Sequence, residues 1–289
     1  MTQAQTFDPV AFKNETREEW QSIAAGWRKW HDVLEGENAG HAISARLVEL
    51  AGITRGASVL DVAGGYGEPS LTAARIVGPE GRVVCTDLSP EMLAFGKERA
   101  AEAGAANVEF VERDAEQLEF DEATFDAVVS RAGLMFLPDV AGTLGRLHTF
   151  LKPGGRIVAS VWGPLPKVQY LAGFPIVFQE LQLPPPPPGR PGVVALSDAD
   201  ELAALVEGAD FRDVETGTII SSFETETPEE FTQFMSDLAP RSITGLIDSQ
   251  PGEVRERLWR KVTAVWTQFL DDDGRVRTRD EAIWVVGTK

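Results

Sequence analysis

The chain has 289 residues, of which 43% are hydrophobic and 25% charged, as expected for one large globular domain or one domain with an insertion. Its formal charge of −18 argues against a nucleic-acid surface and against docking on anionic lipid, because both need a basic excess. The single cysteine, Cys85, allows no internal disulfide, and no apolar run approaches the roughly 18 residues of a membrane span. Since the N-terminus shows no export signal, we expect a cytoplasmic protein that does not insert into a membrane.

Residues 1–45 are expected to form N-terminal lid helices. From residue 10 to about 34, apolar residues recur at spacings near three, four and seven, which is typical of a helix. Three tryptophans on this segment, Trp20, Trp27 and Trp30, either fasten the helix to the core or cover a ligand. His31 follows them and is ambiguous, because a lone histidine at a helix end is more often a solvated or capping group than a base.

The stretch 59–70 reads as a buried strand, a glycine turn and the start of a helix. Glycines at 65 and 67 leave room for a ligand to approach the backbone, and two cofactor classes use such a turn. From Gly65 to Ser70 it partly matches the dinucleotide fingerprint G-x-G-x-x-G/A. From Asp61 it matches the D-x-G-x-G-x-G turn of S-adenosylmethionine (SAM) enzymes, except for Ala63, which is compatible if its φ is negative. A tight turn without a ligand is the third interpretation.

Two acidic residues follow the next two predicted strands. Asp87 ends the strand at 82–86, twenty positions beyond the last glycine of the turn. In a doubly wound sheet, an acid at this place can accept both ribose hydroxyls of a nucleotide. The alternative role for Asp87, capping the next helix, is served at least as well by Ser89. Asp114 follows the strand at 107–112 and either accepts from an adenine amino group or is a surface acid.

The remaining pattern completes an α/β fold. Further strands are expected at 125–130, 156–162, 211–222 and 282–288, and helices at 41–51, 69–77, 90–103, 138–150, 197–208, 228–238 and 253–270. The alternation predicts a seven-stranded, mostly parallel sheet whose last strand is antiparallel. Residues 46–223 would form the core, 224–280 a helical cap insertion, and 281–289 the last core strand.

Five motifs in the expected order and spacing give the chain a family resemblance. They lie at 61–67, 87–89, 114–115, 128–131 and 151–155. With them the chain resembles the class I SAM-dependent methyltransferases, over about residues 20–289. The run at 131–139, R-A-G-L-M-F-L-P-D, is similar to the bacterial small-molecule branch that includes the ubiquinone and menaquinone C-methyltransferases. The resemblance implies a Rossmann-like fold and SAM as the cofactor.

The resemblance also implies a set of cofactor-binding residues. Glycines 65 and 67 would flank the methionine part of SAM, while Asp87 would hold the ribose. Arg131 would lie at the methionine end. The full set that the resemblance implies is Asp61, Gly65, Tyr66, Gly67, Asp87, Leu88, Met92, Asp114, Ala115 and Arg131. Within this set, Leu88 and Met92 would contact the adenine faces, and Asp114 and Ala115 the adenine edge.

The favoured function is therefore transfer of a methyl group from SAM to a small, largely apolar acceptor, by C- or O-methylation of a quinone, phenol or other secondary metabolite. Aromatic residues on segments expected to line or cover the acceptor pocket are Trp27, Trp30, Trp162, Phe231 and Phe234. His31 is the candidate catalytic base, needed only if the acceptor loses a proton. No metal is expected, and the protein would be a monomer or homodimer. A non-catalytic SAM- or nucleotide-binding module is the alternative, followed by an NAD-dependent oxidoreductase.

Overall fold

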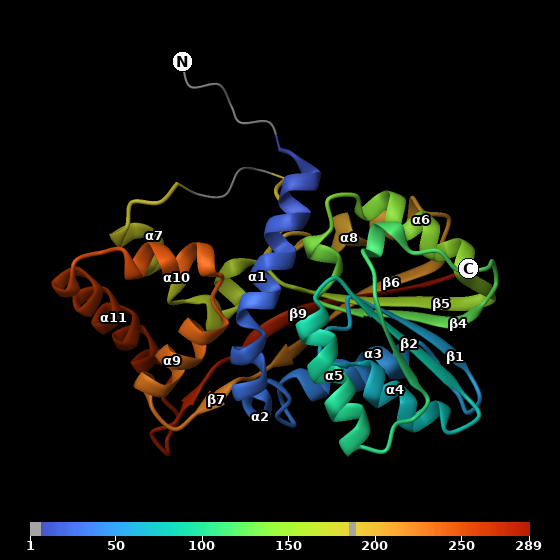
Figure 1. Cartoon of the computed structure of the whole chain (residues 1–289), viewed down its shortest axis with the longest axis horizontal. Coiled ribbons are helices and arrows are strands. Elements are labelled where there is room, and N and C mark those ends of the chain that lie inside the picture. The colour runs from blue at the N-terminus through green and yellow to red at the C-terminus, as the bar shows by residue number, and fades with distance from the viewer. Residues whose placement is uncertain (1–6, 185–188) are drawn as a thin grey trace.

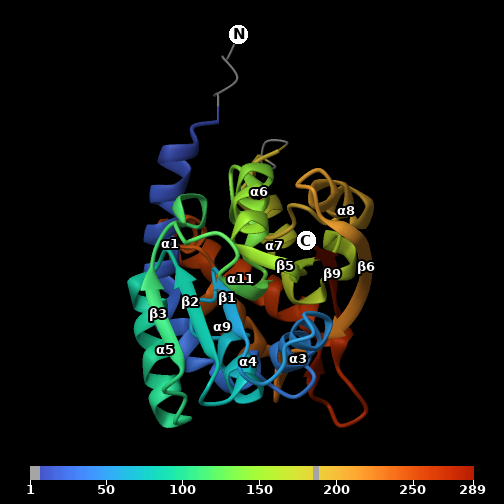
Figure 2. The same ribbon diagram turned by 90° about the vertical axis from the view of Figure 1, so that its right-hand side faces the viewer.

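A seven-stranded sheet in the order β3-β2-β1-β4-β5-β9-β6 carries the fold. The computed structural model describes residues 7–184 and 189–289. Strands β1 to β5 run parallel, whereas β9 is antiparallel to both of its neighbours, β5 and β6. The strands are β1 (Ser58–Val62), β2 (Arg82–Asp87), β3 (Val108–Glu112), β4 (Phe125–Arg131), β5 (Leu151–Trp162), β6 (Arg212–Ser221) and β9 (Asp280–Thr288). The predicted seven-stranded α/β sheet is thereby confirmed, and Figure 2 shows β3, β2 and β1 side by side.

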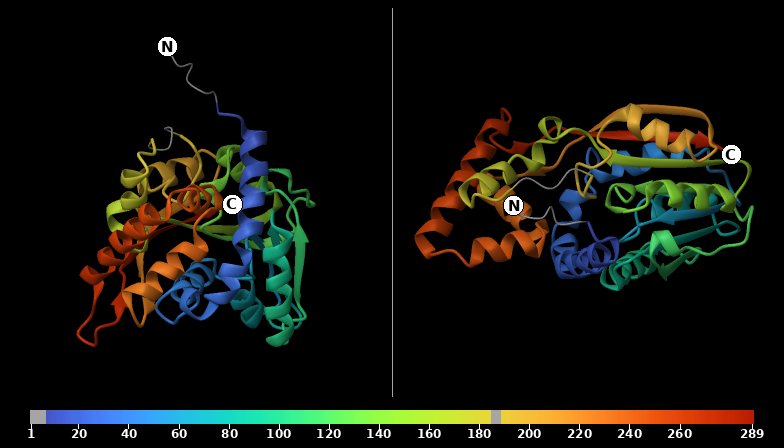
Figure 3. Two further views of the ribbon diagram at one scale, coloured as in Figure 1. Left: turned by 60° about the vertical axis from the view of Figure 1, so that its left-hand side comes forward. Right: turned by 90° about the horizontal axis from the view of Figure 1, so that it is seen from above.

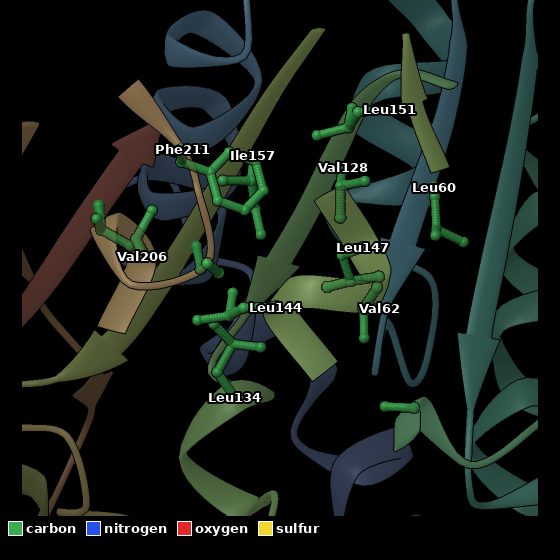
Figure 4. Close-up of a cluster of buried hydrophobic side chains, with 14 of the residues drawn as sticks. Leu60, Val62, Val128, Leu134, Leu144, Leu147, Leu151, Ile157, Val206 and Phe211 are labelled. Carbon is green, nitrogen blue, oxygen red and sulfur yellow. The ribbon is translucent and has the colours of Figure 1, made fainter. Parts of the chain in front are cut away.

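Alternate residues along the central strands are buried against helices on opposite faces of the sheet. Val59 of β1 packs in one cluster with α3 (Gly40–Leu50) and α4 (Ser70–Val77). Its neighbours Leu60 and Val62 belong to the other cluster, with side chains from α6 (Val140–Phe150) and α8 (Ala199–Glu207). Figure 4 shows this second cluster around Leu60, Val62, Leu144 and Leu147. Burial on both faces explains the near-continuous apolar runs of these strands.

Side-chain caps set where two of the helices begin. Ser89 accepts a hydrogen bond from the Met92 N–H and caps α5 (Pro90–Glu102), so the predicted capping role of Ser89 is confirmed. Asp198 caps α8, because its Oδ1 accepts hydrogen bonds from the N–H groups of Asp200 and Glu201.

The N-terminal helical segment divides at Trp30. Helix α1 (Pro9–Lys29) ends there, and α2 (His31–Leu34) continues in a new direction, so the prediction of one helix over 10–34 was wrong at this point. The Trp30 indole N–H donates to Asp237 Oδ2 at 2.8 Å, which ties the break to the cap. Helix α1 contacts α5 on one side and the cap helices α9 and α10 on the other. It thus lies between the sheet domain and the cap, as Figures 1 and 3 show.

The cap has its own apolar core. It contains α7 (Phe174–Glu180), α9 (Pro228–Leu238), α10 (Arg241–Asp248), α11 (Gly252–Trp266) and a ribbon of β7 (Glu224–Thr225) with β8 (Val276–Arg277). Helix α10 and the ribbon were missed by the sequence analysis, which expected helices only at 228–238 and 253–270. The buried cluster also takes in Trp30, Leu34 and Val177, which lie outside 224–280. The cap is therefore assembled from three separate stretches of the chain.

Candidate functional site

The glycine turn stands at the carboxyl end of β1. Gly65 and Gly67 have φ angles of 52° and 96°, which suit glycine. Ala63 has a φ of 56°, so the condition under which alanine suits this turn, a negative φ, is not met, and the backbone is strained here. A Cβ added to Gly65 would lie 3.4 Å from Met92 Cε and 3.8 Å from Asp87 Oδ2. The turn thus presents bare backbone between Met92 and Asp87, where a ligand can approach closely.

Asp87, at the tip of β2, faces this bare backbone. Its Oδ2 accepts from the Gly65 N–H at 2.9 Å and its Oδ1 from the Ser89 N–H at 2.8 Å. Burial raises the pKa of Asp87 to about 6, although the same backbone N–H groups act to lower it. Each carboxylate oxygen has capacity for a further donor. An ionised Asp87 with spare acceptor capacity beside an open turn fits the two hydroxyls of a ribose.

Asp114 is held by the lid helix. Lys13 of α1 lies with its Nζ 2.9 Å from Asp114 Oδ2 and 2.5 Å from Glu116 Oε2. The other Asp114 oxygen accepts from the Glu116 N–H at 2.9 Å, which starts the short helix η1 (Ala115–Gln117). The sequence analysis missed Lys13, because nothing in the pattern of α1 shows which strand end it reaches. Lys13 therefore links the lid helix by an ionic contact to Asp114, the residue proposed to contact the adenine edge.

Asp61 is fully buried at the end of β1 and fastens the start of α4. Its Oδ2 accepts from Ser70 N at 3.0 Å and from Ser70 Oγ at 2.6 Å, while no described residue donates to its Oδ1. Burial raises the pKa of Asp61 to about 7, against the lowering effect of the Ser70 hydrogen bonds and Arg131. These contacts assign Asp61 a structural task beneath the turn.

The raised pKa of Asp61 should make the stability of the fold depend on pH. Because the folded-state pKa exceeds that of the unfolded chain, the stabilising contribution is present below about pH 4 and is lost as the pH rises through about 7. Relative to an Asp61→Asn variant, the wild-type free energy of unfolding should therefore fall by about 2–3 kcal/mol between about pH 5 and pH 8. Urea unfolding of both proteins at the two pH values measures this difference. A difference that does not change with pH would contradict the assignment.

Arg131, at the tip of β4, is the centre of a buried polar network. One of its terminal nitrogens, Nη2, donates to Glu35 Oε1 at 2.6 Å and to the Tyr66 hydroxyl, which in turn donates to Glu35. The other, Nη1, donates to the Gly40 carbonyl at 2.8 Å and to Ser44 Oγ at 3.0 Å. The sequence analysis missed Glu35, which sits in the loop after α2 with no motif around it. The network joins the glycine turn, β4 and the lid segment.

Aromatic side chains of α1 cover the turn. The Trp27 ring lies 5.3 Å from the Tyr66 ring and 5.5 Å from that of Trp20, centroid to centroid. Trp20 in turn meets Phe136 of η2 (Leu134–Phe136) edge-on at 5.5 Å. Met92 is buried in the same cluster, and Leu88 beside Asp87 stays half-buried. Trp20 is one of the three tryptophans that the sequence offers as a lid, and Phe136 lies in the family motif, but neither was among the predicted acceptor-binding residues.

The other predicted acceptor-binding aromatics divide into two groups. Trp162, at the end of β5, packs against Tyr170 at 5.2 Å and Phe223 at 6.2 Å, where the sheet meets the cap. Trp30, Phe231 and Phe234 are buried inside the cap cluster, with exposed fractions of 8%, 0% and 1%. Packing within the cap is enough to account for these last three residues.

His31 packs beside the glycine turn, on the side that faces Phe95 of α5. Its ring is edge-on to Tyr66 and Phe95, and its Nδ1 is 3.3 Å from Asp32 Oδ1. Its Nε2 is buried, with no hydrogen-bond partner in the described part of the chain. The residue lines a groove of about 1020 Å³ that runs between α4 and α5 towards the amino ends of β2 and β3. His31 thus contacts Tyr66 and Phe95, and none of the contacts among the described residues joins it to Arg131 or Asp87.

Comparison with known proteins gives a family. The model of the ubiE/COQ5 methyltransferase family matches residues 14–165. The ubiquinone/menaquinone biosynthesis C-methyltransferase UbiE of Pseudomonas putida is 38% identical over 143 residues, which are 49% of this chain and 55% of that protein. The chain therefore spans about half the length of the curated relatives it matches, and it belongs to the ubiE/COQ5 methyltransferase family. The resemblance stated from the sequence is confirmed.

Solved structures share the fold. A putative methyltransferase from Bacillus halodurans matches with a TM-score of 0.54 at 23% identity, covering 86% of this chain and 99% of that one. A phosphoethanolamine N-methyltransferase from Haemonchus contortus, solved with S-adenosyl-L-methionine, matches with a TM-score of 0.58 at 18% identity, covering 99% of this chain and 60% of that one.

None of the helices among residues 7–184 and 189–289 combines the length and the apolar character needed to span a membrane.

Proposed function

We propose that the protein is a SAM-dependent methyltransferase that methylates a small, largely apolar acceptor, such as a quinone or a phenol, on carbon or oxygen. The observation that carries this proposal is the pairing of Asp87 with the open backbone at Gly65, in a chain of the ubiE/COQ5 family. An acid at the tip of the second strand beside a glycine turn is the arrangement that doubly wound folds use to hold a nucleoside. The relative UbiE, named for C-methylation in quinone biosynthesis, favours a quinone-like acceptor.

In this proposal each part of the site holds one part of SAM. Asp87 accepts from the ribose hydroxyls, Leu88 and Met92 pack on the adenine, and the turn at Gly65 and Gly67 admits the methionine portion. Asp114 and Ala115 lie at the adenine edge, and Arg131 at the methionine end. When bound, SAM supplies a methyl group on a sulfonium, an electrophile whose leaving group is neutral. The chain's own task is then to align the acceptor and to exclude water.

The acceptor would lie where lid, cap and sheet meet. We propose that residues 1–45 act as the lid and 224–280 as the main part of the cap, over a core of 46–223 completed by 281–289. Trp27 and Trp162 stand at this junction and would contact the acceptor, whereas Trp30, Phe231 and Phe234 would shape it from within the cap cluster. Aromatic walls with few polar groups suit an apolar ring. We further propose that the protein works in the cytoplasm as a monomer or homodimer.

Alignment, rather than proton removal, is proposed to supply most of the rate. His31 stays the candidate base if the acceptor must lose a proton, but it packs against Tyr66 and Phe95. We therefore expect His31→Gln to change turnover by less than about threefold, well below the roughly 10²–10⁴-fold of a general base. The measurement is turnover of the accepted substrate across about pH 6–9. A loss of about 10²-fold or more, with the acidic limb of the pH profile removed, would establish His31 as the base.

Binding and product analysis test the proposal as a whole. Titration calorimetry with SAM and with NAD, followed by mass spectrometry of a quinone and phenol panel incubated with SAM, separates three outcomes. SAM binding with a methylated product supports the methyltransferase. SAM binding without turnover on any acceptor favours the non-catalytic module, and NAD binding without SAM binding favours an oxidoreductase.

A further inference from the structure

Three of the chain's connections between the sheet and the cap pass Asp280, the first residue of β9. One connection runs from β5 to α7 and includes the short helix η4 (Gln169–Leu171). The other two join β6 to β7, through residues 222–223, and β8 to β9, through residues 278–279. Asp280 is fully buried where these connections meet. A side chain at such a crossing can fix how the cap sits on the sheet.

The Asp280 carboxylate ties the three connections together. Its Oδ1 accepts from the Tyr170 backbone N–H at 2.8 Å, and its Oδ2 accepts from the Thr278 hydroxyl at 2.5 Å. The Thr278 hydroxyl in turn accepts from the Phe223 N–H at 3.1 Å, and the Thr278 N–H donates to the Phe223 carbonyl. Burial raises the pKa of Asp280 to about 6, so the carboxylate is ionised at neutral pH and accepts at both oxygens.

The buried charge of Asp280 is held by neutral donors. The nearby Lys167 pairs with Glu281, the next residue along β9, at 3.0 Å. A buried carboxylate without a cation costs free energy that an apolar residue at the same place would not. In return, its two oxygens take separate donors and so join two segments in a fixed geometry. This geometry indicates a positioning task for Asp280.

Three aromatic rings stand at the same crossing. Trp162, Tyr170 and Phe223 form what we call the aromatic wall. The Tyr170 and Phe223 rings lie 5.2 Å apart, and both contact Trp162, at 5.2 and 6.2 Å between ring centroids. Phe223 also contacts Phe234 of α9 at 5.6 Å. The aromatic wall therefore connects the end of β5 to the core of the cap.

The aromatic wall and Asp280 lie on the face of the sheet that carries Arg131. Trp162 pairs with Ala282, two residues beyond Asp280 on β9, so all three side chains share one face. Arg131 pairs with Ser160 of β5, two residues before Trp162, which places it on that face as well. Arg131 and Trp162 end parallel strands and so lie at the same edge. This is the edge at which the acceptor is proposed to bind.

We infer that Asp280 is a positioning residue for the methyl acceptor, because it holds the three connections together and thereby fixes the aromatic wall against which the acceptor ring packs. The inference rests on the proposed function and adds to it a residue that need not touch either substrate. Methyl transfer requires the acceptor atom, the methyl carbon and the sulfur in line, so a displaced wall slows the reaction. Asp87 and the glycine turn lie on β2 and β1, beyond β4 and β5 in the sheet order. SAM binding should therefore not depend on Asp280.

Variants of Asp280 and of its donor Thr278 test the inference by the kinetics of the two substrates. Thr278→Val removes the hydroxyl that Asp280 accepts from and keeps the side-chain shape, whereas Thr278→Ser keeps the hydroxyl. With 1,4-naphthohydroquinone as the probe acceptor, Asp280→Asn and Thr278→Val should raise the KM for the acceptor by about fivefold or more. The KM for SAM should change by less than about twofold in both, and Thr278→Ser should keep both KM values within about twofold of the wild type.

Hydrogen exchange followed by mass spectrometry measures the crossing itself in the full chain. Peptides that cover 163–173, 222–226 and 276–281 should exchange faster in Asp280→Asn and Thr278→Val by about tenfold or more, while the peptide of the glycine turn should not change. Leu144→Ala is the control for a general loss of stability, because Leu144 is buried on the other face of the sheet. It should leave the ratio of the two KM values unchanged.

Each other result has a distinct meaning. If Asp280→Asn and Thr278→Val raise both KM values equally, or neither, Asp280 does not position the acceptor and the inference is wrong. Faster exchange at the crossing with an unchanged acceptor KM would assign Asp280 to the fold alone, and a selective rise in Leu144→Ala would make the effect general; both overturn the inference. SAM binding by each variant shows that it is folded, and Thr278→Val decides the matter if Asp280→Asn does not fold. If the wild-type protein methylates neither the probe nor any acceptor of the panel, the proposed function itself fails, an outcome separate from the others.

Discussion

Replacing Arg131 by methionine is expected to lower the free energy of unfolding by about 3–5 kcal/mol, the cost of leaving one member of a buried ion pair alone. The Glu35 carboxylate would keep its burial and lose its ion-pair partner, and the Gly40 carbonyl and Ser44 hydroxyl would lose a donor. Methionine keeps much of the side-chain length of arginine. The lowered free energy of unfolding therefore reflects the lost charge and hydrogen bonds more than a cavity. Denaturant unfolding at neutral pH measures the effect.

The pH dependence of this variant has a definite sign. In the wild-type protein the pKa of Glu35 is lowered overall, because Arg131 outweighs burial, so its contribution is present above the unfolded-state value and is lost as the pH falls. Without Arg131, burial is opposed only by the Tyr66 hydrogen bond and by Arg99, so we expect the pKa of Glu35 to rise and stability to be lost as the pH rises instead. The free energy of unfolding that Arg131→Met loses relative to the wild type should therefore be larger near pH 8 than near pH 5.

Two further variants control the experiment. Adding Glu35→Gln to Arg131→Met removes the lone buried charge and should recover part of the loss, which a double-mutant cycle measures. Arg28→Met breaks an exposed pair with Glu98 and should change stability little. A loss for Arg131→Met no larger than that for Arg28→Met would show that the buried network contributes nothing to the fold.

Replacing Asp87 by alanine is expected to raise the dissociation constant of SAM at least tenfold, and about 10²-fold if both ribose hydrogen bonds are lost. A hydrogen bond to a charged acceptor is worth about 1.5–3 kcal/mol, and Asp87 has one oxygen for each hydroxyl. The variant also loses the acceptor of the Gly65 N–H, so the turn itself becomes less ordered. Titration calorimetry of the two proteins with SAM gives the comparison.

The pKa of Asp87 adds a check on this result. Because burial raises that pKa to about 6, the wild-type carboxylate becomes protonated as the pH falls below about 6 and loses acceptor capacity. SAM affinity of the wild-type protein should fall over that range, whereas Asp87→Ala should lack this dependence. Glu91→Ala, which removes an exposed charge from the first turn of α5, should leave SAM affinity unchanged. An unchanged dissociation constant for Asp87→Ala would refute the ribose role.

The site residues that lie at the strand ends could be predicted from their spacing along the chain. Asp87 could be placed because a βα unit has a nearly fixed length, so an acid twenty positions beyond the glycine turn falls at the tip of the next strand. Asp114 was placed at the same sheet edge because it follows the next predicted strand, whereas the place of Arg131 was implied by the family resemblance. Spacing could not show what else reaches that edge. Lys13, Trp20 and Glu35 come from the N-terminal segment, whose position depends on packing against α5 and the cap.

The α/β class, the seven strands in chain order and the glycine turn with Asp87 beside it could be predicted from the amino-acid sequence, because they follow from local periodicity and short-range spacing. The meeting of Tyr66 and Arg131 with Glu35, at separations of 31 and 96 residues, became visible in the folded chain. The tertiary structure also decided that Phe231 and Phe234 fill the cap rather than stand at its surface. A helical pattern identifies an apolar face but not its partner, and the partner is set by how all the elements pack together.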